Sequence, residues 1–553
     1  MTSSSVSGSK ALVEKLIENW LDSASERSYQ QVFCQILAAT GHRVLHSTRH
    51  TGIEFGKDVF TVGPDGVGCA YQLKGNPGKK LTLKQYREEV QEQIIQLVTQ
   101  PVIFPGFPNE PHRSYLVTNG EFEEEVHRSV DDLNRAGYYS KLELIPRGVL
   151  YSQCLDLGLS LWPSEIQDSR KLLEIYLSNP NSQVDIPNLS SILGGILKIE
   201  GMRPRFQFKS EFVRAVPSAA LLTGISTSGH VEQRNHWAVI SAWCMFYVSV
   251  IGSADKHGYR IDGSVLHSLN LAYQSIMDEL VQLWQEVASR SHMVEGIPIT
   301  DQVVYRWRYT LLLGLFSVLM LEDERSSVLS EEARTQLESW LTKKHEHAVL
   351  WGEGAVPSFY LWLTWLRKYD PTIRPDYQIA QLVRAVLHLN RNGNDHALVG
   401  PYVSYEEVTK LRMGLAGVED DIAWDRESFD GVSHVTESLY HLLVRTNLKQ
   451  ACKGFWPEYS KIMHCSCIPD EAWEYCTVSI KSGVEEARIY PETYLWSDLR
   501  ADALKSAYDR VPDELLCRPW LVALWWLLVP YRMTPWACAA YIEQVHPGWG
   551  HPL

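Results

Sequence analysis

The chain has 553 residues, of which 45% are hydrophobic and 21% charged, and 52 Lys/Arg against 66 Asp/Glu give a formal net charge of −14 at pH 7. This composition is typical of a globular protein with several domains and excludes collagen, coiled-coil and disordered classes. The negative charge also argues against a protein that coats nucleic acid over its whole surface. Residues 1–150 carry 16 Lys/Arg and 18 Asp/Glu, whereas the remaining residues carry 36 and 48. We therefore expect any nucleic-acid contact in the N-terminal part, through a local patch.

The ten cysteines lie mostly within apolar stretches, in a chain too long to depend on a disulfide framework. The first residues lack the charged-then-apolar pattern of a secretory signal. These features predict a cytoplasmic protein in a reducing compartment. The apolar run Trp237–Ala254 is interrupted by Ser241, Ser249 and Gly252, which favours a buried core helix over a membrane span, so we expect no membrane contact.

Helix and strand signals alternate along the first 150 residues. The spacing of apolar residues predicts helices over 11–21, 27–39 and 81–99. The sequence Thr118-Asn119-Gly120-Glu121 resembles a capping box, which predicts a further helix that ends near Gly137. Strands are expected over 43–46, 57–62, 67–73, 114–117 and 141–145. This order predicts an N-terminal α/β domain.

The rest of the chain has a different character. A segment rich in Pro, Asn, Ser and Asp follows residue 164, and beyond about residue 200 the periodicity is mostly helical. Helices are expected over 265–287, 301–321, 331–341, 358–367 and 519–529. We therefore predict a domain over 1–165, a linker over 166–200, and a large all-α region over 201–553 that consists of one or two subdomains.

A hairpin in the N-terminal domain brings polar side chains together. The sequence Pro64-Asp65-Gly66 suits a three-residue hairpin loop, which pairs Gly63 with Val67 and sets the register of both strands. In that register Asp58 lies opposite Gln72, and Gln72 shares a face with Lys74, two residues along its strand. The opposite face receives Val59, Tyr71 and Leu73, which suits a core.

This grouping has a definite chemistry. A carboxylate and an amide oxygen can hold Mg²⁺, a hard cation that keeps several waters and uses few protein ligands. The metal lowers the pKa of a bound water and offsets negative charge in a phosphoryl transition state. An ammonium such as that of Lys74 can position the water or neutralise phosphate charge. These are the groups needed to hydrolyse a phosphodiester.

The pattern Asp58…Gln72-x-Lys74 and the surrounding helix–strand order resemble the PD-(D/E)XK nuclease superfamily, and in particular its Mrr-like restriction endonuclease branch, where Gln often replaces the second acid. The segments 29–44 and Tyr115–Phe122 resemble the family's first helix and following strand, and its strand entering the second conserved helix. The resemblance covers about residues 10–160. It implies a restriction-endonuclease-like α/β domain with a central mixed sheet, and a DNA endonuclease that uses Mg²⁺, with Mn²⁺ as a substitute. Asp58 and Gln72 would then lie near the metal, and Lys74 would be catalytic.

The sequence departs from the family at one further ligand position. Family members usually place a Glu on the first helix near the position of Gln30; here Glu26 lies one turn earlier on the same side. Glu54, in the loop before Asp58, is another candidate metal ligand. Four cations follow the motif and are candidate DNA-phosphate contacts, with a solvated helix start as the alternative: Lys79, Lys80, Lys84 and Arg87.

Three alternative interpretations remain open at the level of sequence. The domain could be a non-catalytic scaffold that binds DNA or a partner, with Gln30 and Gln72 as signs of decay. Arg391 and His396 match the short R-(N/D/H)-x-x-x-H signature of HEPN ribonucleases, which cut RNA without a metal. The Cys- and His-rich segment 464–467 could bind zinc, although its spacing favours free thiols.

The resemblance also suggests a biological setting. No nucleotide-hydrolysing motif follows a strand, so sensing or ATPase activity would come from a partner protein. The acidic helical region would sense, restrain or assemble, as in an effector of a prokaryotic anti-phage defence system. Because one nuclease site cuts one strand, double-strand cleavage would favour a homo-oligomer or a partner complex.

Overall fold

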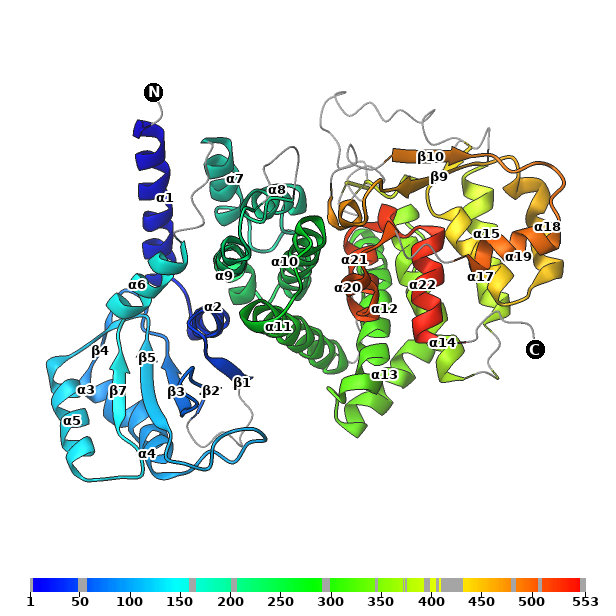
Figure 1. Cartoon of the computed structure of the whole chain (residues 1–553). Helices are drawn as coiled ribbons and strands as arrows, with labels where there is room; N and C mark the ends of the chain where they lie inside the picture. The colour runs from blue at the N-terminus through cyan, green and yellow to red at the C-terminus, as the bar shows by residue number, and fades with distance from the viewer. Residues whose placement is uncertain are drawn as a thin grey trace. The chain divides into compact units, whose positions relative to one another are not determined.

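The computed structural model describes residues 3–47, 57–158, 166–199, 206–290, 299–343, 347–370, 372, 375–391, 398–403, 407–408, 431–478, 484–505 and 510–547. The chain forms two compact units, Met1–Ile276 and Met277–Leu553. Figure 1 labels the helices and strands of both units.

A five-stranded mixed sheet forms the centre of the N-terminal domain. Its strands are β1 (Arg43–Ser47), β2 (Val59–Val62), β3 (Gly68–Lys74), β5 (Arg113–Thr118) and β7 (Leu142–Ile145), in the order β1-β2-β3-β5-β7. The pairs β1–β2 and β2–β3 are antiparallel, whereas β3–β5 and β5–β7 are parallel. The expected mixed sheet is therefore present, and the predicted hairpin strands β2 and β3 lie within it.

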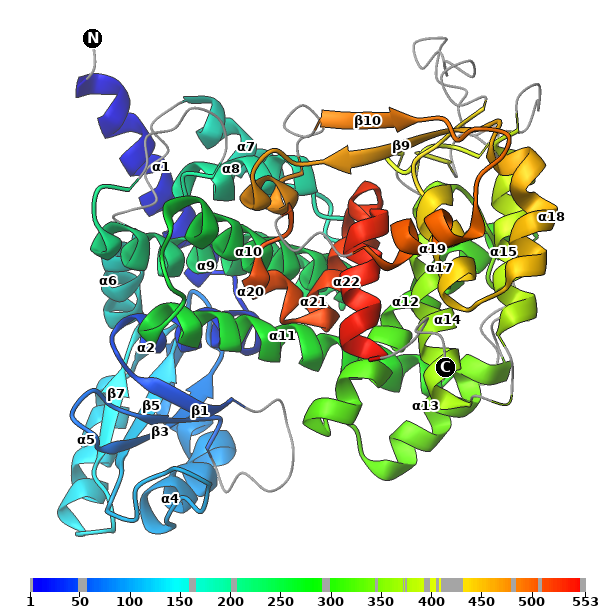
Figure 2. The ribbon, with the colours of Figure 1, turned by 45° about the vertical axis from the view of Figure 1, so that its right-hand side comes forward.

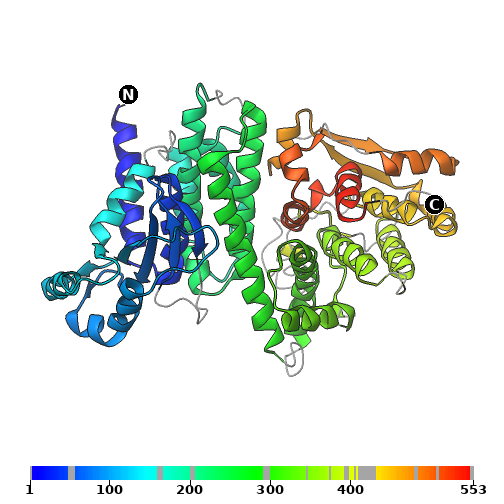
Figure 3. The same ribbon diagram turned by 60° about the horizontal axis from the view of Figure 1, so that its bottom comes forward.

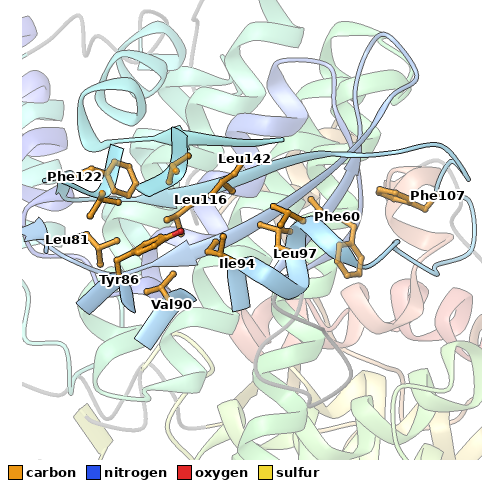
Figure 4. Close-up of a cluster of buried hydrophobic side chains, with 14 residues drawn as sticks. Phe60, Leu81, Tyr86, Val90, Ile94, Leu97, Phe107, Leu116, Phe122 and Leu142 are labelled. Atoms are coloured by element: carbon orange, nitrogen blue, oxygen red, sulfur yellow. The ribbon is translucent and has the colours of Figure 1, made fainter. Parts of the chain in front are cut away.

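Helices cover both faces of this sheet. The helix α2 (Glu26–Ala39) packs on one face, where Phe33 meets the ring of Tyr71 edge-on at 5.3 Å. The other face is covered by α4 (Gln91–Thr99), and Figure 4 shows the apolar side chains that fill the space between them. This core includes Phe60, Ala70, Ile94, Leu97, Leu116 and Leu142. The alternation of side chains along β2 and β3 explains why both faces are apolar.

The segment predicted as one helix over 81–99 is more divided. It contains β4 (Lys80–Leu81), α3 (Leu83–Gln85), the π-helical turn η1 (Tyr86–Val90) and α4. Thr82 forms a capping box with Gln85 at the start of α3, so the helical run begins just after the short strand.

The capping box predicted at Thr118 is wrong. Glu121 and Phe122 form β6, which pairs in parallel with β4, and α5 (Glu124–Arg135) begins only after Glu123. The reason is tertiary: Glu121 N donates to Lys79 O at 3.0 Å and Glu123 N to Leu81 O at 3.2 Å, so this backbone pairs with β4 and the residue before it instead of starting a helix.

The predicted linker over 166–200 contains helices. The helices α7 (Ile166–Tyr176) and α8 (Ile186–Ile196) bury Leu172 and Leu189 and belong to the same compact unit as the sheet. That unit extends to Ile276, so the segment expected to be a linker consists of helices packed within it, and the division of the chain at residues 165 and 200 stays a prediction. Polar and proline residues at the helix ends gave this segment the composition of a linker.

Of the remaining helices of this unit, Lys209–Glu232 packs against α2, and Figure 3 shows green helices next to the blue strands of the sheet. The remaining helices are α1 (Ser3–Leu21), α6 (Arg147–Gly158), α9 (Lys209–Glu232), α10 (His236–His257) and α11 (Gly263–Ala288), whose last residues lie beyond the unit boundary. Among the described residues, α10 alone is long and apolar enough to cross a membrane, but 94% of its apolar window is buried inside the protein. This burial agrees with the expected core helix.

The second unit is mostly helical but is not all-α. Its three-stranded sheet, of order β10-β9-β8, corrects the all-α prediction, and Figure 2 shows β9 and β10 side by side. Its strands are β8 (Val432–Ser433), β9 (Met463–Ile468) and β10 (Val484–Arg488). Its helices include α12 (Ile299–Ser326), α13 (Glu331–Lys343), α14 (Val356–Tyr369), α15 (Asp376–Leu389), α17 (Thr436–Arg445), α18 (Lys449–Tyr459), α19 (Trp496–Leu504), α20 (Asp513–Leu516), α21 (Pro519–Leu528) and α22 (Pro535–Val545).

Candidate active site at the ends of β2 and β3

The hairpin register matches the sequence prediction. Val59 pairs with Tyr71 and Val62 with Gly68, and Gly63 N donates to Val67 O at 2.8 Å. Gly66 takes the left-handed conformation that the loop requires, with φ of 81°. The loop therefore fixes the register from Val59 to Val67, and it brings Asp58 near Gln72 but not into the directly opposite position that was predicted.

Asp58 and Gln72 are hydrogen-bonded to each other. Gln72 Nε2 and Leu73 N both donate to Asp58 Oδ2, each at 2.6 Å. Asp58 N donates to Tyr71 O at 2.8 Å, one position short of the ladder register, so β2 leaves the ladder at Asp58. The Asp58 carboxylate is thereby turned towards β3 and fixed against it.

The carbonyl oxygen of the Gln72 side chain is buried and has no hydrogen-bond partner in the described part of the chain. Gln72 is 2% exposed, and its NH₂ group also lies 3.3 Å from Leu73 O. The two acceptors of this NH₂ group, Asp58 Oδ2 and Leu73 O, fix the orientation of the Gln72 amide, because a flipped amide would direct its oxygen at the Asp58 carboxylate. A buried oxygen without a partner costs about 1–3 kcal/mol. A metal ion or a water molecule would satisfy it.

The helix α2 holds the end of β3 at two successive residues. Glu26 Oε2 accepts a hydrogen bond from Gly75 N at 3.1 Å. Tyr29 Oη accepts from Lys74 N at 3.1 Å and lies 3.2 Å from Lys74 O and 3.3 Å from Val117 O. A Cβ on Gly75 would come within 2.9 Å of the Glu26 backbone nitrogen, so the close approach of α2 requires glycine there.

The predicted site residues are brought together only in part. Lys74 is half-buried and shares a face of β3 with Gln72, as alternation requires. Gln30 is buried, and its Nε2 donates to Ser47 Oγ at the end of β1 at 3.2 Å. Glu54 lies outside the described residues. Within the described ranges, no group of three or more His, Cys, Asp or Glu side chains is placed to hold a metal ion.

The four predicted DNA-contacting cations are all exposed. Lys79 follows β3 in the loop, Lys80 lies on β4, Lys84 on α3 and Arg87 on η1. Within the part of the chain that the structure describes, none of the four forms an ion pair. The segment therefore offers positive charge to solvent directly after Lys74 in sequence, as a phosphate-contacting surface requires.

Asn119 is a positioning residue that sequence reasoning missed. Its Oδ1 accepts from Asn76 N at 2.9 Å, and its Nδ2 donates to Leu21 O at 2.9 Å and to Ala24 O at 2.7 Å. This fully buried side chain ties the loop after Lys74 to the turn before α2. The Asn-Gly dipeptide was the available signal, since it indicates a turn.

Lys57, next to Asp58, is a buried lysine whose pKa can be tested through the pH dependence of protein stability. It is 2% exposed, and burial lowers the pKa of its ammonium to about 8. Because the unfolded chain keeps a Lys pKa of about 10.4, the unfolded state binds more protons between these values, and stability should rise with pH across this window. We expect Lys57→Met to raise the free energy of unfolding at pH 7 by about 1–3 kcal/mol and to remove this rise.

Chemical denaturation at pH 7 and pH 10 measures both effects. Lys141→Met, at an exposed position of the same domain, is the control and should change neither value. A Lys57→Met protein with unchanged stability at pH 7 and an unchanged rise towards pH 10 would show that the Lys57 ammonium is solvated.

The other predicted sites gain no support. The helix α15 ends at Leu389, before Arg391, and His396 lies outside the described residues. Cys465 and Cys467 are free and buried, and burial raises the pKa of both thiols, which disfavours the thiolates that zinc requires.

Comparisons of the chain with protein-family models, with curated proteins and with solved structures find no match. What the arrangement can do chemically follows from the side chains themselves. Asp58 and the Gln72 side-chain carbonyl offer oxygen ligands, Lys74 offers an ammonium on the same face as Gln72, and exposed cations follow.

Proposed function

We propose that the N-terminal domain, residues 1–165, is a Mg²⁺-dependent DNA endonuclease with a restriction-endonuclease-like fold of the Mrr type. The observation that carries the proposal is the Asp58–Gln72 pair, joined at 2.6 Å, with Lys74 two residues further on the same strand face. The mixed order of the sheet, with its functional strands β2 and β3 inside it, supports this assignment.

The side chains present fit a magnesium ion. The unpartnered Gln72 Oε1 and the Asp58 carboxylate are the hard oxygen donors that Mg²⁺ prefers, and Glu26 lies at the same strand end. When bound, the metal lowers the pKa of a water ligand and offsets charge on the phosphoryl group. Asp58 is held ready by Leu73 N and Gln72, Lys74 neutralises the charge that develops on the phosphate, and the exposed cations hold the flanking DNA backbone.

Plasmid cleavage by the full chain tests this function. Supercoiled plasmid is incubated with Mg²⁺, with Mn²⁺ and with EDTA, and Lys74→Met is assayed beside the wild type. Nicking that requires the metal and is lost in Lys74→Met supports the proposal. Plasmid that stays supercoiled under all three conditions contradicts it.

The exposed cations make a prediction for the salt dependence of DNA binding. Each phosphate contact releases counterions, so Lys84→Ala and Arg87→Ala should each reduce the slope of log K against log salt by roughly 1. Fluorescence anisotropy of a labelled duplex across a salt series measures the slope. Arg128→Ala is the matched control, since Arg128 is exposed on α5 but ion-paired with Glu124, and it should leave the slope unchanged. Equal slopes for the wild type and the three variants would show that the DNA does not contact Lys84 or Arg87.

A second candidate function is a non-catalytic DNA- or partner-binding scaffold. Two contacts favour this function: Gln72 Nε2 donates to Asp58, and Gln30 Nε2 donates to Ser47 Oγ. Both glutamines therefore serve as hydrogen-bond donors within the protein, and Asp58 is the carboxylate in direct contact with Gln72. Such a protein would bind DNA with the same affinity in Mg²⁺ and EDTA and would cut neither DNA nor RNA. A metal-independent ribonuclease would instead cut RNA in EDTA.

The proposal extends to the setting of the enzyme. We place it in the cytoplasm as an effector of a prokaryotic anti-phage defence system, with the acidic remainder of the chain restraining the nuclease. A homo-oligomer, or a partner protein that supplies sensing or ATPase activity, would bring two sites to the two DNA strands.

A further inference from the structure

The phenol of Tyr29 contacts the backbone at the end of β3. Tyr29 reaches from α2 and contacts both the N–H and the C=O of Lys74, at 3.1 Å and 3.2 Å, and it also reaches Val117 O on β5. The hydroxyl has one proton to share between the two carbonyls and accepts from the amide. A single side chain therefore links the backbone of Lys74 to the neighbouring parallel strand and to α2.

We propose that Tyr29 is a positioning residue for Lys74, an inference that rests on the proposed nuclease function. A lysine side chain has four rotatable bonds, so the place of its ammonium depends first on where its Cα is held. Fixing the Lys74 backbone at both polar groups removes the freedom that the end of a strand would otherwise have. The Cα of Lys74, from which the side chain and its ammonium extend, is then held in a fixed position two residues from Gln72.

The helix α2, which carries Tyr29, packs against α9. A Cβ at Gly224 of α9 would lie 2.4 Å from the side chain of Val32, which shows how closely the two helices pack. At the start of α2, Glu232 Oε1 accepts from Ser28 Oγ at 2.9 Å and from Ser25 N at 3.3 Å. Since α2 is packed between the sheet and α9, the Tyr29 hydroxyl is presented from a rigid element.

The charges of the site act on the Tyr29 hydroxyl. Burial, together with the negative charges of Glu26 and Asp58, raises the pKa of Tyr29 well above its usual value. The phenol is therefore protonated over the whole pH range in which a nuclease would work. It acts on Lys74 through hydrogen bonds and takes no part in proton transfer.

Single-turnover cleavage by the full chain tests this role with Tyr29→Phe. At saturating DNA and Mg²⁺ we expect the rate to fall about 10- to 100-fold, because a displacement of about 1 Å at a reacting group has effects of this size. DNA affinity and Mn²⁺ affinity, measured separately, should stay within about twofold, since the variant keeps every charge. Tyr86→Phe is the matched control, because Tyr86 is equally buried in the same domain and lies in its apolar core; its cleavage rate should match the wild type.

The outcomes separate this inference from the proposed function. A wild-type protein that cuts, with Tyr29→Phe as fast as Tyr86→Phe, overturns the positioning role and leaves the nuclease intact. A Tyr29→Phe protein that loses DNA and Mn²⁺ affinity together with its rate has lost its fold, and this too overturns the specific role. A wild-type protein that never cuts overturns the proposed function, and with it this inference.

Discussion

Replacing Asp58 by asparagine is expected to lower the rate of DNA cleavage by about 10²–10³-fold or more, the size of effect seen when a charge-stabilising group is removed from a transition state. Asparagine has the same shape, and its side-chain oxygen can still accept the bonds from Gln72 Nε2 and Leu73 N. The substitution therefore removes the negative charge that the metal needs while retaining the contacts that hold the hairpin. Plasmid nicking and calorimetric Mn²⁺ binding measure the two consequences.

The same hairpin offers a control for this substitution. Asp65 lies in its loop, exposed, and is paired with Arg113 at 2.7 Å. Asp65→Asn removes an equal charge at the opposite end of the hairpin from Asp58, and this variant should cut DNA at the wild-type rate. Cleavage by Asp58→Asn at the rate of Asp65→Asn would show that Asp58 does not serve the metal.

Replacing Gly120 by valine is expected to lower the free energy of unfolding by about 3 kcal/mol, at the upper end of the effect of overpacking. A Cβ at this position would lie 2.4 Å from Lys79 O and 2.5 Å from Asn76 O. Both contacts are backbone oxygens, and each already accepts a hydrogen bond, from Glu121 N and from Lys79 N respectively. The loop after Lys74 cannot yield without breaking these bonds, so DNA cleavage should fall together with stability. Thermal unfolding followed by circular dichroism measures the change.

Gly148 provides the comparison for Gly120. A Cβ there meets only the side-chain oxygen of Glu121, at 3.9 Å. Gly148→Val should therefore change the melting temperature far less than Gly120→Val. Equal melting temperatures for the two variants would mean that the turn at Gly120 is looser than its contacts indicate.

The part of the site that sequence predicts is the part set by local geometry. The loop Gly63–Val67 is five residues long and permits few conformations, so the register of the hairpin from Val59 to Tyr71 follows from it, whereas the departure of Asp58 from the ladder does not. The helix over 27–39 was likewise evident from its apolar spacing, and α2 has nearly the same bounds. Such features depend on neighbours within about 15 residues and on turn chemistry.

The features that sequence reasoning missed are long-range. Tyr29 contacts Lys74 across 45 positions and Asn119 contacts Asn76 across 43, and no local pattern reveals either pair. Such contacts overrode a good local signal at Thr118–Glu121, where pairing of β6 with β4 replaced the expected helix start. In the second unit, β9 reads Met-His-Cys-Ser-Cys-Ile, an alternation of apolar and polar residues that is a strand signal, and the all-α prediction overlooked it.

The contact between Asn119 and Ala24 has a consequence for the synthesis of the chain. The two residues are 95 positions apart, and a ribosome adds about 5–20 residues per second. The turn before α2 therefore waits roughly 5–20 s after its own translation before Asn119 is made. During this interval the helix α2 of the nascent polypeptide lacks the complete sheet on which it packs, so a translational pause before residue 119 would lengthen its exposure to chaperones and proteases.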